Sequence, residues 1–334
     1  MHLEISFNFS ILIFCVSIVL LWLFSNRLSD VVNYIDDSFN LGSSFGGTII
    51  LSIVTNLPEI AITVNGAIRG DVDLAVGNIL GGILIQSMLL VLFDMASRKE
   101  RKPFSTLVSD SASLIQGCVL IGILVMVVIG HQMGDAILPI RSTIPEWLIA
   151  GTWIAGILIM RKVQSGKTKT NDAKISGKFT KRSALIWLVL ISIIVLIFGV
   201  LLEVTSDNIA THLHINGVIF GATILALVTS LPEISGGLEF VKDKTYQPII
   251  SDIFGGNAFL PVLFLVASLI TNDAILPKAH NVDIYLTGMS ILITSIYMIG
   301  MILKLPNRKW GMGYDSWIAL ALYLLSVAGM FFIG

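Results

Sequence analysis

Long apolar runs, separated by short polar breaks, make up most of the chain. A run of about 20 apolar residues can cross a bilayer as one helix, so the pattern predicts membrane helices rather than a water-soluble core. The predicted helices cover residues 5–26, 41–68, 72–96, 109–130, 145–161, 183–204, 215–240, 247–271, 283–303 and 315–333. The expected fold is therefore an all-α polytopic membrane protein with about ten transmembrane helices.

The longest polar break lies in the middle of the chain and is strongly basic, with eight Lys or Arg residues and one Asp between Arg161 and Arg182. It divides the predicted helices five and five, which gives a first repeat at 1–160, a linker at 161–182 and a second repeat at 183–334. After an odd number of spans the second half starts on the opposite side of the membrane. Two related halves must then be inverted, as in many alternating-access carriers.

Short loops on the same side as the linker are rich in positive charge, which predicts that this side is cytoplasmic. The basic residues of these loops are Arg27, Arg98, Lys99, Arg101, Lys102, Lys242, Lys244, Lys304, Arg308 and Lys309. The opposite loops contain fewer bases and several acids, namely Arg69, Arg141 and Lys278 with Asp71, Asp73, Asp135 and Asp207. Both termini are therefore expected on the outer side of a cell membrane.

The composition supports a polytopic membrane protein. Charged residues make up only 13% of the chain and hydrophobic residues 55%, with a mean hydropathy of +0.88. The net charge of −1 gives no sign of a nucleic-acid partner, and no nucleotide-binding or Ser-His-Asp pattern occurs in a suitable context. We expect no enzyme activity, no ATP and no bound cofactor. The expected protein is a monomer in the lipid bilayer that acts on small inorganic cations and is driven by an ion gradient.

A seven-residue sequence occurs twice, as Val54–Ile60 (VTNLPEI) and as Val228–Ile234 (VTSLPEI), with six identical positions. Each copy places a carboxylate, Glu59 or Glu233, directly after a proline inside an apolar run. A charge at bilayer depth is costly, so it indicates a functional group. The proline also frees a backbone carbonyl that can turn toward an ion.

The separation of the two glutamates, 174 residues, also aligns the helices that follow them. Gly77–Gly82 (GNILGG) then matches Ser251–Gly256 (SDIFGG) without a gap. Positions four residues apart form one face of each helix, with Asn78, Gly82 and Gln86 in the first repeat and Asp252, Gly256 and Leu260 in the second. Small residues let helices approach closely, which predicts a contact between the two helices of each repeat unit through Gly81, Gly82, Gly255 and Gly256.

The residue types around the two glutamates suit a hard cation, whose protein ligands are carboxylate, carbonyl and hydroxyl oxygens. Two glutamates neutralise one divalent ion, which removes most of the cost of burying them. Without that ion they require protons or monovalent cations, and this requirement is the basis of an exchange reaction. The candidate ion-binding residues are Glu59, Glu233, Thr55, Thr229, Asn56, Ser230, Gln86, Asn78 and Asp252.

The paired TNLPE and TSLPE units, each followed by a glycine-rich helix, resemble the two alpha-repeats of the sodium/calcium exchangers and of the wider calcium/cation antiporter superfamily. The family pattern is G-T-S-x-P-E followed by G-N-x-x-G-S-N-x-x-N or -D. The resemblance implies that Glu59 and Glu233 bind Ca²⁺ together, and that the backbone carbonyls of Thr55 and Thr229 complete this metal site. It also implies that the first and sixth helices slide as a gate.

In the resembled family, the residue at Asn56 and Ser230 helps to bind sodium. Other positions depart from the family pattern: Gly82 and Gly256 replace serine, Gln86 and Leu260 replace asparagine or aspartate, and Asp252 replaces asparagine. The calcium pair is thus complete while several sodium ligands are missing. The sequence favours a divalent-cation antiporter and leaves open whether Na⁺ or H⁺ is the coupled ion. The alternatives are a carrier for Mg²⁺, Mn²⁺ or K⁺, and an uncoupled channel or ion-sensing membrane protein.

Overall fold

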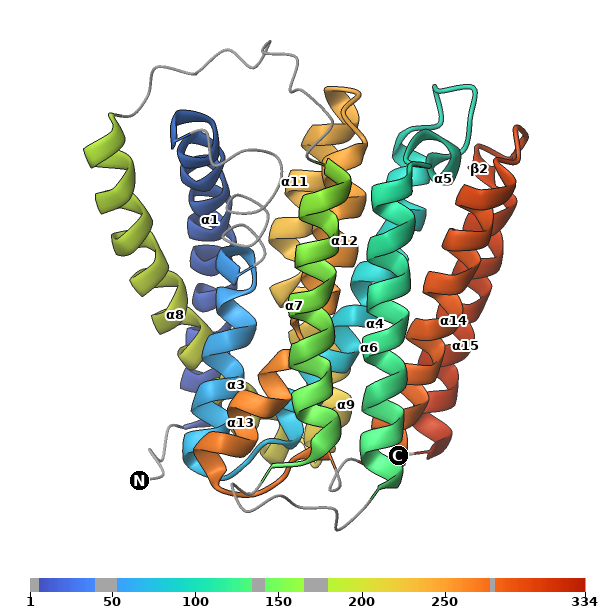
Figure 1. The fold of residues 1–334 in the computed structure, drawn as a ribbon. Helices are drawn as coiled ribbons and strands as arrows, with labels where there is room; N and C mark the ends of the chain where they lie inside the picture. Colours follow the sequence, from blue (N-terminus) through green and yellow to red (C-terminus); the bar gives the residue numbers. More distant parts are fainter. Residues whose placement is uncertain (1–5, 40–52, 134–141, 165–179, 277–279, 334) are drawn as a thin grey trace.

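The protein is a bundle of long helices, seen in a computed structural model that describes residues 6–39, 53–133, 142–164, 180–276 and 280–333 (Figure 1). The helices of the first half are α1 (Phe7–Phe39), α3 (Leu57–Arg69), α4 (Asp73–Ala96), α5 (Phe104–Leu107), α6 (Ser111–Gln132) and α7 (Ile144–Gln164). Those of the second half are α8 (Lys181–His212), α9 (Gly217–Phe220), the π-helix η2 (Gly221–Leu225), α10 (Ala226–Thr229), α11 (Leu231–Lys242), α12 (Gln247–Phe259), α13 (Val262–Thr271), α14 (Asn281–Leu303) and α15 (Tyr314–Ile333). A short antiparallel hairpin, β1 (Arg308–Lys309) and β2 (Met312–Gly313), joins α14 to α15.

Seven helices in the described part of the chain are long and apolar enough to cross a membrane, and a bent pair between Gly217 and Lys242 makes an eighth candidate. The predicted polytopic all-α fold is therefore confirmed. The first 12 residues of the predicted helix over 41–68 lie outside the described residues, as do Arg141, Asp135, Lys278 and positions 165–179 of the linker. The prediction ended the first helix too early, because α1 continues to Phe39 and buries Leu28, Val31 and Ile35 beyond its most apolar part.

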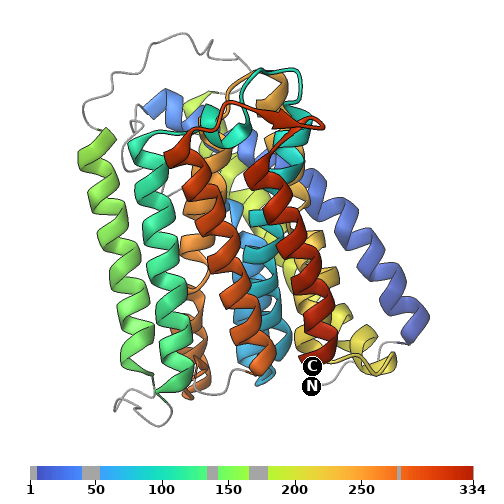
Figure 2. The same cartoon turned by 90° about the vertical axis from the view of Figure 1, so that its right-hand side faces the viewer.

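The bundle has two ends that differ in which loops they carry. We use "linker end" for the end that carries residues 97–103, 243–246 and 304–313, where Lys244 pairs with Glu100 at 3.3 Å. The "termini end" carries residues 70–72 and 213–216, and the described chain both begins and ends there (Figures 1 and 2). α7 ends and α8 begins at the linker end (Figure 1).

Prolines interrupt the helices near the centre of the bundle. Pro58 and Pro232 lie in the first turns of α3 and α11, where a missing N–H costs no helical hydrogen bond. The helix pair that meets at Ser230 is bent by 41°. Pro261 separates α12 from α13, so the predicted helix over 247–271 is a span with an interruption. The first repeat has Ser87 at the matching position, and α4 is continuous.

Glycines bring the two repeats into backbone contact. A Cβ atom on Gly77 would collide with the backbone of Val218, and one on Gly81 with the backbone of Ala222. Such an approach of α4 to α9 and η2 is possible only because neither glycine carries a side chain. The prediction placed this contact between the two helices of one repeat unit, and it is wrong for Gly81, which contacts the other repeat.

The remaining predicted contact glycines behave differently. A Cβ on Gly82 would meet no heavy atom within 4 Å, so Gly82 forms no close helix contact. A Cβ on Gly256 would lie 3.3 Å from the side-chain amide nitrogen of Asn56, which again belongs to the other repeat. Gly255 is partly buried. The contacts of these glycines depend on how the two repeats fit together. The spacing of residues along one helix does not reveal this fit.

α1 and α8 form the edge of the bundle, and α4 forms its centre (Figure 1). Phe24 and Phe198 stack between α1 and α8 with ring centroids 6.4 Å apart. Only 22% of the span of each of these two helices is buried, compared with 89% for α4. α1 and α8 therefore present most of their surface to lipid.

The two edge helices are attached to the centre by different chemistry. At the termini end, Arg69 at the end of α3 forms ion pairs with Glu203 at 3.1 Å and Asp207 at 2.6 Å, both on α8. α1 is attached to α11 by a neutral hydrogen bond in which Ser235 donates to Asn26 at 2.7 Å. The two repeats thus follow a similar chain path, but charged groups attach one edge helix and neutral groups attach the other.

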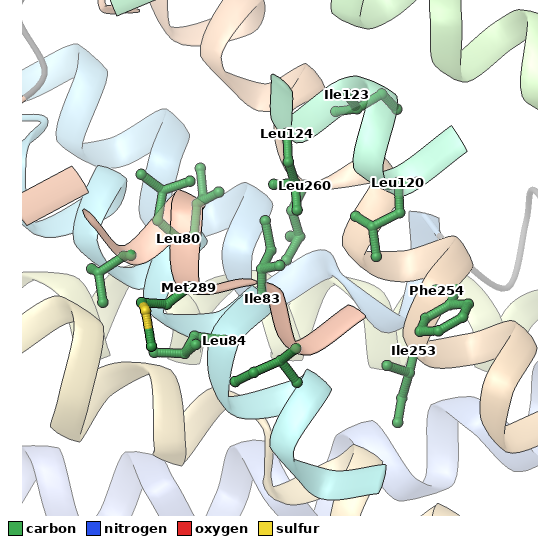
Figure 3. Close-up of a cluster of buried hydrophobic side chains, with 14 of the residues drawn as sticks. Leu80, Ile83, Leu84, Leu120, Ile123, Leu124, Ile253, Phe254, Leu260 and Met289 are labelled. Carbon is green, nitrogen blue, oxygen red and sulfur yellow. The ribbon is translucent and has the colours of Figure 1, made fainter. Parts of the chain in front are cut away.

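An apolar core fills the space between α4, α6, α12 and α14. Figure 3 shows Leu260 beside Ile83 and Leu124, and all three side chains are fully buried. Leu260 therefore has a packing role, as expected for a side chain that cannot bind an ion.

Gly81→Ala is expected to lower thermal stability, because the new methyl group would meet backbone atoms of Ala222 that cannot rotate away. Overpacking of this kind costs about 1–3 kcal/mol. The measurement is thermal unfolding of the purified variants in detergent. Gly82→Ala is the matched control one residue away. Its methyl group meets open space, so its stability should be equal to the parent's or higher by up to about 1 kcal/mol. Equal losses in both variants would contradict the close approach of α4 and η2.

Candidate cation-binding site

The site is centred on two glutamates at the starts of half-helices. Glu59 lies in the first turn of α3 and Glu233 in the first turn of α11, with exposures of 1% and 8%. In each carboxylate the Oε2 atom is buried without a hydrogen-bond partner among the described residues, and none of these residues forms an ion pair with either glutamate. The positive end of a half-helix favours a carboxylate, but two buried negative charges still require a cation.

Other buried acids show what a structural carboxylate looks like in this protein. Asp94 accepts hydrogen bonds from two backbone N–H groups and a hydroxyl at 2.7–2.8 Å. Glu146 accepts from a backbone N–H at 2.8 Å and a hydroxyl at 2.7 Å. Glu203 pairs with Arg69. These three acids are matched by protein donors, whereas Glu59 and Glu233 each keep a buried oxygen without a partner. Asp283 and Asp315, in the first turns of α14 and α15, also keep one such oxygen, so Glu59 and Glu233 stand out because they lie close together in the repeated sequence.

Residues of both repeats surround the glutamates. Glu59 and Glu233 are close enough to repel each other, and the Thr229 side chain of the second repeat lies close to Glu59 of the first. The Thr229 hydroxyl also lies 3.4 Å from the Oδ1 atom of Asn78 on α4. Asn78 is fully buried, and its Nδ2 atom has no hydrogen-bond partner in the described part of the chain. One site shared by both repeats is the geometry expected of inverted halves.

The residues beside the prolines line the same region. Asn56 and Ser230 are buried at the ends of the segments that precede α3 and α11. The Ser230 hydroxyl donates to the carbonyl of Ala226 at 2.8 Å, which leaves its oxygen lone pairs available. Thr55 is partly buried, one residue before Asn56.

Three more buried polar groups occur near this level of the bundle. Gln86 is 2% exposed, and its Nε2 atom has no partner among the described residues. Asn257, which the sequence prediction missed, is fully buried and donates to the carbonyl of Ile83 at 3.5 Å. Thr63, also missed, lies one turn beyond Glu59. A buried amide within an otherwise apolar helix was the sequence signal for Asn257.

Asp252 differs from the other candidates because it is only partly buried. It lies close enough to Glu233 for electrostatic repulsion, and no hydrogen bond or ion pair links it to another described residue. The described residues contain no group of three or more His, Cys, Asp or Glu side chains arranged to hold one metal ion. A cation at the centre would therefore be held by two carboxylates with hydroxyl, amide and carbonyl oxygens, a donor set that suits a hard cation.

The overall fold matches solved ion exchangers. The structure titled "Crystal Structure of H+/Ca2+ Exchanger CAX" superimposes with a TM-score of 0.69 at 12% identity, covering 97% of this chain and 87% of the other. A structure of the sodium-calcium exchanger NCX_Mj gives a TM-score of 0.62 at 19% identity and covers 97% and 99%. The protein thus shares the fold of these two exchangers.

Sequence comparison gives the family. The model of the sodium/calcium exchanger protein family matches residues 9–156 and 183–332, one match for each half of the chain. The chain belongs to this family of membrane antiporters, as the two repeats predicted. Inner membrane protein YrbG of Escherichia coli (strain K12) is 26% identical over 317 residues, which cover 90% of this chain and 93% of that protein.

Glu59→Gln and Glu233→Gln are each expected to stabilise the metal-free protein by about 1–2 kcal/mol at pH 8, because each removes a buried charge that no protein cation matches. The measurement is thermal unfolding in chelator-treated buffer whose only cation is large and organic. Glu203→Gln is the control, since it breaks the pair with Arg69 and should lower stability. Destabilisation by all three substitutions would show that Glu59 and Glu233 are structural acids.

Proposed function

We propose that the protein is a secondary active antiporter that exchanges a divalent cation, Ca²⁺ first, for Na⁺ or H⁺ by alternating access. The supporting observation is the pair of buried carboxylates, Glu59 and Glu233, that the described protein groups leave unmatched. Their two charges cancel those of one divalent ion. When that ion leaves, monovalent cations or protons must replace it, and this requirement couples the two fluxes.

Each candidate residue has a role in this proposal. Glu59 and Glu233 bind the divalent ion and then its replacement, and the backbone carbonyls of Thr55 and Thr229 complete the shell. Asn56, Ser230, Asn78 and Gln86 supply further amide and hydroxyl oxygens around the centre. The chain works as a monomer in the cell membrane, without ATP or a bound cofactor, with the basic linker in the cytoplasm and both termini outside.

The edge helices α1 and α8 are the moving gate in this proposal. Their large lipid-facing surface lets them slide without disturbing the apolar core between α4, α6, α12 and α14. Movement of α8 must break the ion pairs of Arg69, whereas movement of α1 must break neutral hydrogen bonds of Ser235, which donates to Asn26 and accepts from the Trp22 indole N–H at 3.2 Å.

The choice of the coupled ion depends on positions near the site where this chain differs from the family pattern. Gly82 and Gly256 carry no hydroxyl, and the buried Leu260 offers no oxygen. One solved neighbour is titled an H⁺/Ca²⁺ exchanger and another a sodium-calcium exchanger, so the shared fold is compatible with either coupling. The loss of three side-chain ligands weighs against a full set of sodium sites. The flux assay below distinguishes coupling to H⁺ from coupling to Na⁺.

Ca²⁺ uptake by proteoliposomes is expected to follow an imposed Na⁺ or H⁺ gradient and to stop when an ionophore dissipates that gradient. Glu59→Gln and Glu233→Gln should reduce this uptake at least about 100-fold, since a site with one carboxylate no longer cancels a divalent charge. Glu239→Gln is the matched control, because Glu239 is an exposed acid on the same helix as Glu233. Radiolabelled Ca²⁺ uptake measures each case.

Three outcomes would contradict parts of the proposal. Undiminished uptake in either glutamine variant would exclude the two-glutamate site. Uptake that ignores both gradients would indicate an uncoupled channel or an ion-sensing protein. Stronger competition by Mg²⁺, Mn²⁺ or K⁺ than by unlabelled Ca²⁺ would identify a different transported cation.

A further inference from the structure

A groove between α4 and α15 contains none of the candidate ion-binding residues. It has a volume of about 250 Å³ and is enclosed by α4, η2, α10, α14 and α15. An apolar cavity of roughly 150 Å³ already accepts a molecule of the size of benzene, so this groove has room for a longer hydrocarbon. We call it the α4–α15 groove.

The inner wall of the α4–α15 groove reaches the central helix of the bundle. Leu84 and Ile85 on α4 and Leu286 on α14 line this wall, and all three side chains are buried. α4 is the most central of the long helices, with 89% of its span buried. The groove is therefore a deep opening between helices and not a shallow depression on the surface.

The rim of the groove faces the bilayer. Ile224 in η2 and Leu227 in α10 line it with exposures of 43% and 50%, and both belong to the bent span that starts at Gly217. Apolar side chains that are exposed within a membrane span contact hydrocarbon, because the bilayer core contains no water. The groove thus opens toward the acyl chains of the membrane.

The lining suits a hydrocarbon and offers almost nothing to a polar ligand. Of the lining side chains, only those of Thr223 and Tyr323 carry a hydroxyl, and none carries a charge. The Thr223 hydroxyl already donates to the carbonyl of Ile219 at 2.6 Å. A lipid headgroup, a hydrated ion or a polar protein segment would lose hydrogen bonds in the groove, whereas a hydrocarbon chain would lose none.

The groove lies in the half of the bilayer at the termini end. α4 starts at Asp73, so Leu84 is the twelfth of its 24 residues and marks the middle of the bundle. α15 starts at Tyr314 and ends at the termini end (Figure 2), so Met330 is the seventeenth of its 20 residues and lies near that end. The groove therefore extends from mid-depth toward the termini end, which is the path of one acyl chain of a phospholipid in that leaflet.

We propose that the α4–α15 groove binds one acyl chain of a phospholipid from the termini-end leaflet, and that this chain supports the contact between the two repeats. Ala222 lines the groove, and its backbone is the surface against which Gly81 of α4 packs. Ala222 belongs to η2, a π-helix, which is a rare element that occurs mostly at functional sites. The inference goes beyond the proposed transport and does not depend on the transported ion.

The test uses a phospholipid that carries a diazirine near the end of one acyl chain, reconstituted with the full-length protein. The protein is transferred into detergent before irradiation, which removes lipid from open surfaces such as those of α1 and α8, whose spans are only 22% buried. Mass spectrometry of the peptides then locates the label. Label is expected in α10 and α15, with little or none in α1 and α8.

Val327→Trp should remove most of this label, because Val327 lines the groove and the larger ring occupies the space of the chain. Leu324→Trp is the matched control on the same helix. Leu324 is 60% exposed and lies outside the lining, so its variant should keep the label. If Val327→Trp does not fold, Ile224→Trp on the exposed rim decides and should give the same loss.

The supporting role of the chain has a separate measurement. Added phospholipid should raise the unfolding temperature of the delipidated parent and of Leu324→Trp, because a ligand that binds only the folded state stabilises it. Val327→Trp should show a much smaller rise. An equal rise in all three proteins would overturn the supporting role.

Three results would overturn the binding site. One is equal labelling of α1, α8 and the groove helices, and another is a label that Val327→Trp and Ile224→Trp leave unchanged. The third is labelling by a free fatty acid with the same diazirine but not by the phospholipid. Because the labelling needs no ion flux, a failure of the Ca²⁺ uptake assay would contradict the proposed function and leave this test unaffected.

Discussion

A buried carboxylate in a membrane must be matched by positive charge, and the surroundings of Glu59 and Glu233 contain no described protein cation that could supply it. The half-helices α3 and α11 point their positive ends at these groups, and proline permits both helices to begin inside the bilayer. The helix ends thereby offset part of the free-energy cost of burying two carboxylates, and a transported cation must offset the remainder. The apolar core and the glycine contacts hold the two halves together around this one site, and the edge helices pack on its outer side.

The two repeats follow a similar path but differ in chemistry at several matched positions. Pro261 interrupts the second repeat where Ser87 leaves α4 continuous. Arg69 ties α8 to the centre by ion pairs, while α1 is held by a neutral hydrogen bond. Asp252 occupies the position in the second repeat that matches Asn78 in the first.

The apolar runs predicted the polytopic all-α fold and the order of its helices, since hydropathy follows directly from the cost of exposing polar groups to lipid. They predicted the ends of α1 poorly, because a helix that leaves the apolar layer continues until another contact or a capping residue ends it. The repeat also predicted the paired glutamates at one site. Asn257 and Thr63 were missed, because a single polar residue in an apolar helix does not by itself show which neighbouring helix it faces.

The sequence by itself determined the class of protein, the two inverted halves and the chemistry of the central carboxylates, since repeated residues and hydropathy are local properties of the chain. Tertiary structure decided which surfaces meet. Gly81 contacts Ala222 of the opposite repeat, and Gly82, its neighbour, faces open space. Asp94 and Glu203 are matched by protein donors, whereas Glu59 and Glu233 keep an unpartnered oxygen. Partnering of a buried charge depends on residues distant in the chain, so only the folded protein shows which acids are matched by protein donors.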